Sequence, residues 1–564
     1  MKIPVQLQKY AVSISLCSIL CLIILILLII SNKGFDFSDE GLYAIMTNPR
    51  QSITFSPINY DIIFKILNEH FKYTFDIQGL RLLRIVFTFI GSVFFFLGVR
   101  QIYSKLKLEY ITVLDQFLFV IIAGFISSYN LTIQTPGYNE FSLIGVQVFA
   151  GSFIVLMMKN KVNVYEHIFF ALSVLAGFIL LLLTKPTGIP FVIIFSFLLL
   201  LKSEKRNKIF WFLSVWLLIV IVVLFFPLAD RVSIKNYYNI FRTFSKNSTS
   251  HSFHSLFINI LKGIIPLLLF FIFGYLYAGY KNVFLKKRGH LFITISLLIV
   301  IVVLFVDFKR AFALYSTVRN FYSIYFFSRL NYCLSFLFVF FFAFMTKVKN
   351  IRYDKSFILI FLIPPVLFFA IYFGADGSLL ITFPRAFQFL IISAYLLFPL
   401  KKPGKVILIL SIGFLLKFII SFFVLKPYNQ EAIVNQKIPF AYGKNHNSII
   451  YLDSLQYKNQ KLFHSIISAY NTPYIVGFDI LEGYIYLADK VYPGSFLWGD
   501  EDLKNYFNIK FNFPESFVLV ICRGQEDKLI PYLSKYDFRL YDSKEIVVYS
   551  NVVNKFNFYF CKKK

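Results

Sequence analysis

A series of long apolar runs constrains this chain more than any other feature. About thirteen runs of roughly 17 to 25 residues follow one another between residues 11 and 425, and a helix of that length crosses a hydrocarbon layer about 30 Å thick. The chain has 564 residues, of which 58% are hydrophobic, and its mean hydropathy of +0.69 lies outside the range of soluble globular proteins. The sequence therefore predicts a polytopic α-helical membrane protein.

The first run follows Lys2 and Lys9 and has the general form of a secretory signal. Its length of about 20 residues and the lack of a small-residue cleavage site favour a retained anchor. The sixth run is short and can pair with its neighbour. The predicted spans are 11–30, 82–102, 112–128, 141–158, 167–183, 188–201, 209–228, 256–280, 291–306, 321–345, 356–373, 386–400 and 406–425.

Every second loop between these runs is short and basic. Because Lys and Arg concentrate in cytoplasmic loops, these loops and the amino terminus define the cytoplasmic side. An odd number of spans then places both the first loop and the carboxyl-terminal tail outside. The same loops explain the formal net charge of +28, so no nucleic-acid partner is expected. The basic loops are "KLK" after Tyr103, "KNK" from Lys159, "KSEKRNK" from Lys202, "KKR" from Lys286, "KVKNIRYDK" from Lys347 and "KKPGK" from Lys401.

The composition changes after Pro427. Short β runs such as "SIIYLD" and "FVLVICRG" alternate with helix-like stretches such as "NQKLFHSIISAY", which predicts a small extracytoplasmic α/β domain over 427–564. The rest, 1–426, forms the predicted transmembrane domain and includes the first outer loop, 31–81. The tail carries no glycine-rich phosphate-binding fingerprint. Whether its Cys522 and Cys561 form a disulfide is left open.

Three acids directly follow the first span. They are Asp36, Asp39 and Glu40, in the stretch "SNKGFDFSDEGLYAI". The sequence after them, "NPRQSITFSPINYDIIFKILNEHFKY", is typical of amphipathic segments at a membrane interface. One interpretation is structural: Ser38 caps a helix that starts at Asp39, and acids in its first turn complement the helix dipole. This interpretation is compatible with a catalytic role.

Polar residues in other outer loops accompany the acids. Lys185, in "LLLTKPTGIP", runs against the inside-positive bias and is either functional or snorkels to the interface. Arg385 is either a phosphate ligand or an interfacial anchor. Asn139 and Glu140, in "SSYNLTIQTPGYNEFS", open the fourth span after a Pro-Gly turn. They are also candidates for an acceptor contact or a second acid, a role that only the family resemblance described below implies. Further candidate phosphate ligands in the outer loops are Arg231 and Arg319.

These residue types suit the transfer of a group from a lipid phosphate to an acceptor hydroxyl. The hydroxyl must lose a proton as it attacks the anomeric carbon, so a positioned carboxylate serves as general base, and partial burial raises its pKa toward the working range. The leaving lipid phosphate is already a stable anion and needs cationic clamping more than a general acid. One acidic cluster and several Lys or Arg side chains are therefore enough.

The chain resembles the GT-C glycosyltransferases, in the branch that contains protein O-mannosyltransferases, the lipid A aminoarabinose transferase and rhizobial lipopolysaccharide glycosyltransferases. The resemblance rests on Asp39 and Glu40 soon after the first span, on "LTKPTGIP", and on a multispan body with an outer carboxyl-terminal domain. Asp39 matches the family's catalytic aspartate, Glu40 its neighbour, and Lys185 the lysine near the lipid phosphate. Pro186 departs from the family pattern, in which a glycine often follows that lysine.

The resemblance implies an inverting transfer from a polyprenyl-phosphate sugar. The acceptor would be a lipid-linked glycan, a lipopolysaccharide or a protein, on the outer face of a bacterial cytoplasmic (inner) membrane and in contact with membrane lipids. His251 and His254 have a spacing that suits a metal, but no third ligand lies nearby, so no metal or other cofactor is expected.

Two alternatives from other functional classes stay open. A transporter or flippase for lipid-linked glycans would carry ionisable residues at mid-membrane depth, whereas the predicted span interiors are nearly free of charge, with Lys417 as the main exception. An O-antigen-type ligase or polymerase would use a lipid-diphosphate donor and a late, large outer loop. This chain places its acids in the first loop instead.

Overall fold

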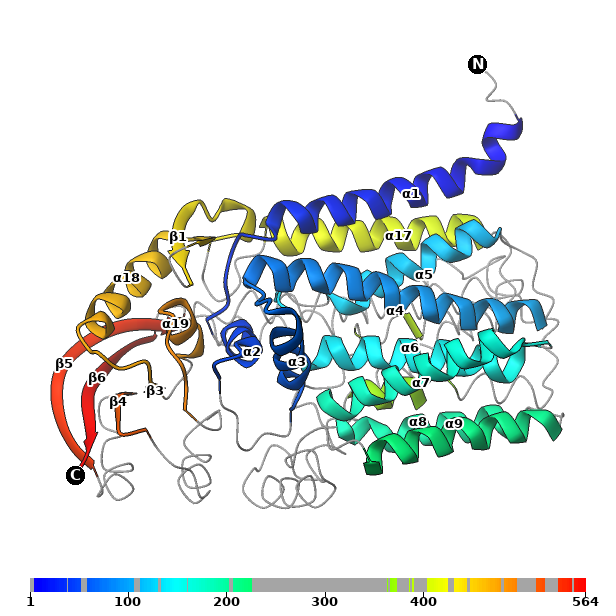
Figure 1. The fold of residues 1–564 in the computed structure, drawn as a ribbon. Helices are drawn as coiled ribbons and strands as arrows, with labels where there is room; N and C mark the ends of the chain where they lie inside the picture. Colours follow the sequence, from blue (N-terminus) through cyan, green and yellow to red (C-terminus); the bar gives the residue numbers. More distant parts are fainter. Residues whose placement is uncertain are drawn as a thin grey trace, which may run out of the picture.

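The computed structural model of the chain shows a body of aligned helices with a small sheet region at one end (Figure 1). The description that follows covers residues 5–37, 39–51, 58–105, 112–129, 133–159, 161–201, 206–225, 363, 366–372, 385, 388–389, 403–424, 431–443, 447–477, 481–493, 514–522, 536–549 and 552–564.

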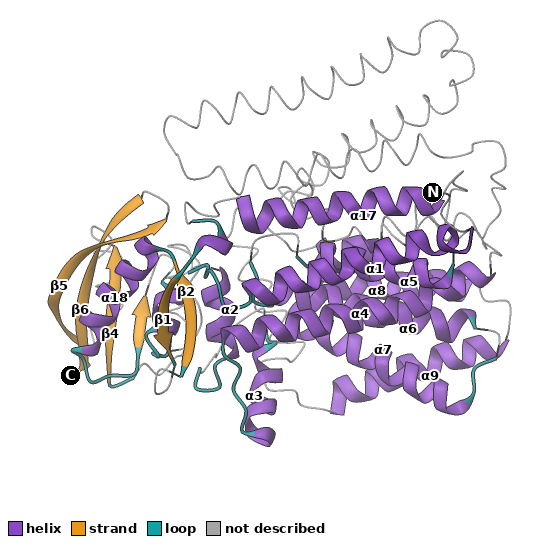
Figure 2. Cartoon of the chain, turned by 90° about the horizontal axis from the view of Figure 1, so that it is seen from above, coloured by secondary structure: helices purple, strands orange, loops and turns teal. Residues whose placement is uncertain are grey.

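The helical body consists of helices that run side by side in both views (Figures 1 and 2). The apolar runs fold this way because a helix satisfies its backbone polar groups internally. Five of the helices within the described ranges are long and apolar enough to cross a membrane: Tyr10–Ile30, Ile77–Lys105, Tyr138–Met158, Val164–Thr184 and Val406–Phe423. The described helices of the body are α1 (Val5–Ile30), α4 (Ile77–Lys105), α5 (Val113–Ser128), α6 (Tyr138–Met158), α7 (Val164–Thr184), α8 (Ile189–Leu201), α9 (Arg206–Phe225) and α17 (Pro403–Ile419).

Eight of the predicted spans coincide with these helices. They are the first seven spans and the last one, although three of the matching apolar segments are short, namely Val113–Ser128, Pro186–Leu201 and Lys208–Val223. The predicted spans 256–280, 291–306 and 321–345 lie outside the described residues, as do most of 356–373 and 386–400. The fold is that of a membrane protein with several apolar helices, and the count of thirteen spans stays a prediction.

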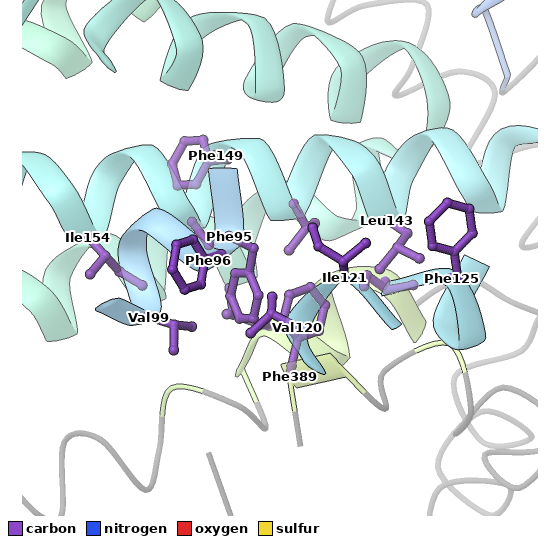
Figure 3. Packing of buried hydrophobic residues seen from close by; sticks show 14 of the residues in the cluster. Phe95, Phe96, Val99, Val120, Ile121, Phe125, Leu143, Phe149, Ile154 and Phe389 are labelled. Atoms are coloured by element: carbon purple, nitrogen blue, oxygen red, sulfur yellow. The ribbon is translucent and has the colours of Figure 1, made fainter. Parts of the chain in front are cut away.

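Helix α6 lies in the centre of the body, because its whole apolar stretch is buried by its neighbours. Phe149 of α6, Phe95 of α4 and Ile121 of α5 belong to one cluster of buried side chains (Figure 3). Glycines bring the backbones close: a Cβ atom at Gly98 would lie 2.8 Å from the carbonyl oxygen of Gly151. In a bilayer such close packing, rather than exclusion from water, holds helices together.

Two short helices lie between the helical body and the tail, α2 (Asp39–Thr47) and α3 (Asp61–Phe71) (Figure 1). Helix α3 is amphipathic, as the sequence predicts: it buries Ile62 and Phe64 and exposes 42% of Ile66 and 73% of Phe71.

Helix α2 is buried on two opposite faces. Leu42, Tyr43 and Met46 pack in a cluster with residues of the helical body, whereas Ala44 and Ile45 belong to the cluster that forms the core of the tail. The side chains of the first loop are therefore shared between the body and the tail.

The tail combines strands and helices, as predicted, while a domain boundary at residue 427 stays a prediction. Strands β1 (Ile438–Tyr442) and β2 (Ser448–Leu452) form an antiparallel pair. A second sheet has the order β3-β4-β6-β5, in which only β3 and β4 are parallel. The other tail elements used below are α18 (Ser454–Ser468), α19 (Glu482–Leu487), β3 (Ile475–Gly477), β4 (Ser516–Cys522), β5 (Tyr536–Tyr549) and β6 (Val552–Lys563).

The sheet register answers the question of a tail disulfide. Cys561 pairs with Phe517 and Cys522 with Phe556, so the two cysteines lie five residues apart along the β4 and β6 pair. That separation corresponds to roughly 17 Å, far beyond the reach of a disulfide. Cys561 is a free, buried thiol, and burial raises its pKa to about 12.

Candidate functional site

The predicted acids and cations of the described chain meet where α2 touches the helical body. Asp36 positions the start of α2: its Oδ2 accepts a hydrogen bond from the backbone N–H of Asp39 at 3.1 Å, and its carbonyl oxygen accepts from Gly41 at 2.9 Å. A side chain that accepts from the first turn of a helix acts as its cap. Ser38, the residue predicted for this role, lies outside the described residues. The geometry assigns Asp36 to shaping the loop.

Glu40 is buried and fully engaged as a hydrogen-bond acceptor. Its Oε1 accepts from Arg81 Nε at 3.0 Å and from the backbone N–H and hydroxyl of Thr135 at 2.6 and 2.5 Å. Its Oε2 accepts from Arg81 Nη2 at 2.9 Å and from the backbone N–H of Asp36 at 3.1 Å. Five donors on one carboxylate leave no oxygen available for a substrate proton.

The charge state of Glu40 follows from these contacts. Burial raises the pKa of the Glu40 carboxyl, but the Arg81 guanidinium and the hydrogen bonds from Arg81 and Thr135 outweigh burial and hold the pKa below its ordinary value. Glu40 therefore stays ionised and ties the first loop to α4. The predicted catalytic role fits Glu40 poorly.

Asp39, the next residue in the chain, has the opposite properties. Its side chain is exposed, yet it is surrounded by enough protein to disfavour a charge. Burial raises the pKa of Asp39, Arg385 opposes this shift, and the Glu140 carboxylate adds to it, so the pKa stands above its ordinary value. An accessible carboxylate with a raised pKa is the state expected of a general base.

Glu140 lies in the first turn of α6, which confirms the interpretation that this acid opens the fourth span. Its Oε2 accepts from the backbone N–H of Gly137 at 3.0 Å, and its Oε1 lies 3.4 Å from Arg84 Nη2. Because its charge also acts on Asp39, Glu140 belongs to the same site. The helix-start and second-acid interpretations are thus compatible.

Lys185 follows the last residue of α7 and is buried, with 4% of its surface exposed. Its Nζ donates to Asn139 Oδ1 at 3.5 Å and to the carbonyl oxygen of Ile371, and lies 6.0 Å from the centre of the Tyr138 ring. The snorkelling alternative is wrong, because the ammonium group points into the protein. Lys185 therefore contacts Asn139, the neighbour of Glu140, while its predicted role as a phosphate ligand stays a prediction.

Arg385 completes the described set of cations. Its Nε is buried and has no hydrogen-bond partner among the described residues, while its charge acts on Asp39. Of the other predicted groups, Arg231, Arg319, His251 and His254 lie outside the described residues. Within the described ranges no three His, Cys, Asp or Glu side chains are grouped so that they could hold a metal ion.

Two arginines were missing from the sequence prediction. Arg81 and Arg84 lie three residues apart in "LRLLRI" at the start of α4, and both are almost fully buried. The inside-positive argument that singled out Lys185 applies equally to them. Arg84 also contradicts the statement that the span interiors are nearly free of charge, since it lies within the predicted span 82–102. Its contact with Glu140, whose charge acts on Asp39, places Arg84 in the same site.

The described part of this site combines cationic and acidic side chains. Arg84, Lys185 and Arg385 accompany the carboxylates of Asp39 and Glu140, and Arg81 and Glu40 compensate each other. Lys185 and Arg385 are thus cations that share the described part of the site with an accessible carboxylate. The arrangement can hold an anionic group and accept a proton beside it.

No protein-family model matches the chain, and no curated protein or solved structure is similar to it at a significant level.

Proposed function

We propose that the protein is an inverting glycosyltransferase that uses a polyprenyl-phosphate sugar as donor. One observation supports this proposal above all others: the accessible Asp39, with a raised pKa, shares a site with Arg385, whose buried Nε lacks a partner among the described residues. A general base next to a guanidinium whose Nε can still donate suits a reaction that creates an anion while a hydroxyl loses its proton.

The proposed reaction balances as follows. The acceptor hydroxyl oxygen forms a bond to the anomeric carbon, and its proton moves to the Asp39 carboxylate. The bond between the anomeric carbon and the phosphate oxygen breaks, and its electron pair stays on the lipid phosphate. Attack opposite to the leaving group inverts the anomeric centre. Lys185 and Arg385 would hold the phosphate, while Arg84 would hold Glu140.

The proposed setting is the outer face of a bacterial cytoplasmic membrane, with the amino terminus inside. The acceptor class would be a lipid-linked glycan, a lipopolysaccharide or a protein. No metal ion is part of the proposal.

The test is a transfer assay in proteoliposomes with radiolabelled polyprenyl-phosphate hexoses and pentoses and a lipid-linked glycan acceptor. Removal of a general base typically lowers the rate by roughly 10² to 10⁴-fold, so Asp39→Asn should lower kcat to that extent without loss of folded protein. Glu69→Gln is the matched control, because Glu69 is an exposed acid on α3. An Asp39→Asn variant as active as the Glu69→Gln variant would refute the proposal.

A further inference from the structure

The backbone of the tail contacts the backbone of α2. At this contact neither the tail nor α2 has room for a side chain. A Cβ atom at Gly41 would lie 2.3 Å from the backbone nitrogen of Gly483 in α19. A Cβ atom at Gly483 would lie 2.5 Å from the Cα atom of Phe37, and the Gly483 N–H donates to the Phe37 carbonyl oxygen at 2.8 Å. The two glycines therefore set how closely α2 and α19 approach. We refer to this approach of Gly41 and Gly483 as the glycine contact.

The chain after α2 is held by the same part of the tail. The Gln51 side chain pairs with both backbone groups of Tyr492: its Nε2 donates to the carbonyl oxygen, and its Oε1 accepts from the N–H at 3.0 Å. Arg50 forms an ion pair with Asp489. A side-chain amide that both donates to and accepts from one backbone residue fixes the position and the orientation of the two segments. The tail therefore holds the chain after α2 as well as the face of α2 itself.

The chain before α2 is held by a different part of the tail. The Gly34 N–H donates to the carbonyl oxygen of Tyr451 in β2 at 2.9 Å, and the Tyr451 N–H donates to Asn32 at 2.9 Å. Gln456 of α18 donates from Nε2 to the carbonyl oxygen of Phe35 at 2.8 Å. Helix α2 is thus enclosed by tail contacts before, along and after its length.

We infer that the carboxyl-terminal tail is a positioning element for Asp39, and that Gly41 and Gly483 are the positioning residues through which it acts. The inference rests on the proposed function, and it adds a role for the tail in that reaction. Asp39 is the first residue of α2 and lies two residues before Gly41. The tail therefore decides where the carboxylate lies relative to the helical body.

The size of the expected effect follows from the distances. Nonbonded carbon atoms approach to roughly 3.5 Å, so a methyl group in the glycine contact must displace backbone by about 1 Å. A misplacement of about 1 Å at a catalytic group can lower the rate by roughly 10²-fold. Among the described residues, the charged and titratable groups near Asp39 include Asp36, Tyr43, Arg385 and Glu140. A displaced α2 changes the distance from Asp39 to Arg385 and Glu140, which lie outside this helix, whereas Tyr43 belongs to α2 and moves with it.

The experiment compares full-length Gly483→Ala with Gly413→Ala in proteoliposomes. Gly413 lies in α17, and a Cβ atom there meets nothing within 4 Å. For Gly483→Ala we expect a kcat roughly 10²-fold lower, a donor KM that changes little, a shifted midpoint of the pH–rate profile, and faster hydrogen exchange of the α2 amides. Gly413→Ala should behave as wild type. Gln51→Ala, a milder change, should alter kcat and the pH profile in the same direction.

The outcomes separate this inference from the proposed function. A wild-type protein that transfers no sugar refutes the function, whatever the exchange data show. An active wild type together with a Gly483→Ala variant whose kcat and pH profile are unchanged overturns the positioning role. If Gly483→Ala fails to fold, Gln51→Ala carries the test, and wild-type kinetics in that variant overturn the inference.

Discussion

Two arginine–glutamate pairs lie one helical turn apart on α4, and they differ in how completely their charges are satisfied. Arg81 and Glu40 share two hydrogen bonds, and each makes three further ones to surrounding groups. Arg84 lies 3.4 Å from Glu140 and also donates to Ser128, Ile133 and Thr135, whereas Glu140 accepts one other hydrogen bond within the described residues, from Gly137. Both pairs are buried, so burial alone does not separate a structural charge from a functional one.

The number of hydrogen-bond donors on each carboxylate indicates which role that carboxylate can have. A carboxylate with five donors is stable as an anion and resists protonation, which suits it to fastening a loop. A carboxylate with few hydrogen-bond donors keeps more of its negative charge uncompensated. The charge of Glu140 accordingly raises the pKa of Asp39. Glu40, with five donors, therefore fastens the loop that carries Asp39, and Glu140, with fewer donors, raises the pKa of Asp39.

The strongest test of this comparison is to make the same change in both pairs. Glu40→Gln should lower the free energy of unfolding by roughly 3–5 kcal/mol, because Arg81 loses its buried counter-charge and the new amide group points N–H at other donors. Glu140→Gln should cost clearly less, since its amide oxygen can still accept from Gly137. Thermal unfolding in detergent measures both, and equal losses would show that the two pairs are equivalent.

A second test concerns Lys185, whose ammonium group donates to the Asn139 side chain and to the Ile371 carbonyl oxygen. Lys185→Met should raise the donor KM by roughly 10 to 100-fold, because a hydrogen bond to a charged group contributes about 1.5–3 kcal/mol. Lys208→Met is the matched control: Lys208 is also buried and donates to the carbonyl oxygens of Leu156 and Lys159, at the opposite end of α6. A donor KM raised equally in both variants would remove Lys185 from the site.

The smallest expected effect is a change in pH dependence. The Glu140 carboxylate raises the pKa of Asp39, so Glu140→Gln should lower that pKa. A general base works when it is deprotonated, and the acidic limb of the kcat profile should therefore move to lower pH in Glu140→Gln. In Glu69→Gln the limb should stay in place. An acidic limb that moves to higher pH, or does not move, would show that the Glu140 charge does not raise the pKa of Asp39.

Several residues of the candidate site were predictable from the sequence, because the ends of apolar runs can be recognised in the sequence. Asp39, Glu140 and Lys185 were each found as polar residues at the end of an apolar run, and the alternation of spans brings such ends together. Arg81 and Arg84 carried the same signal at the start of the predicted span 82–102, but they were not among the predicted site residues. The roles of Asp36 and Glu40 were beyond reach, since three neighbouring acids look alike until their partners are known.

The sequence by itself identified eight apolar segments that are helices in the described part of the chain, the alternation of strands and helices in the tail, and the polar residues at helix ends. These properties depend on composition and spacing along the chain. The tertiary structure decided that Glu40 is saturated and Asp39 accessible, and that the tail encloses α2. The partners of Glu40 and Asp39 include residues 81, 135, 140 and 385, and the contacts of α2 lie in residues 451 to 492. Hydrogen-bond saturation and desolvation are set by such distant neighbours, so no local pattern can specify them.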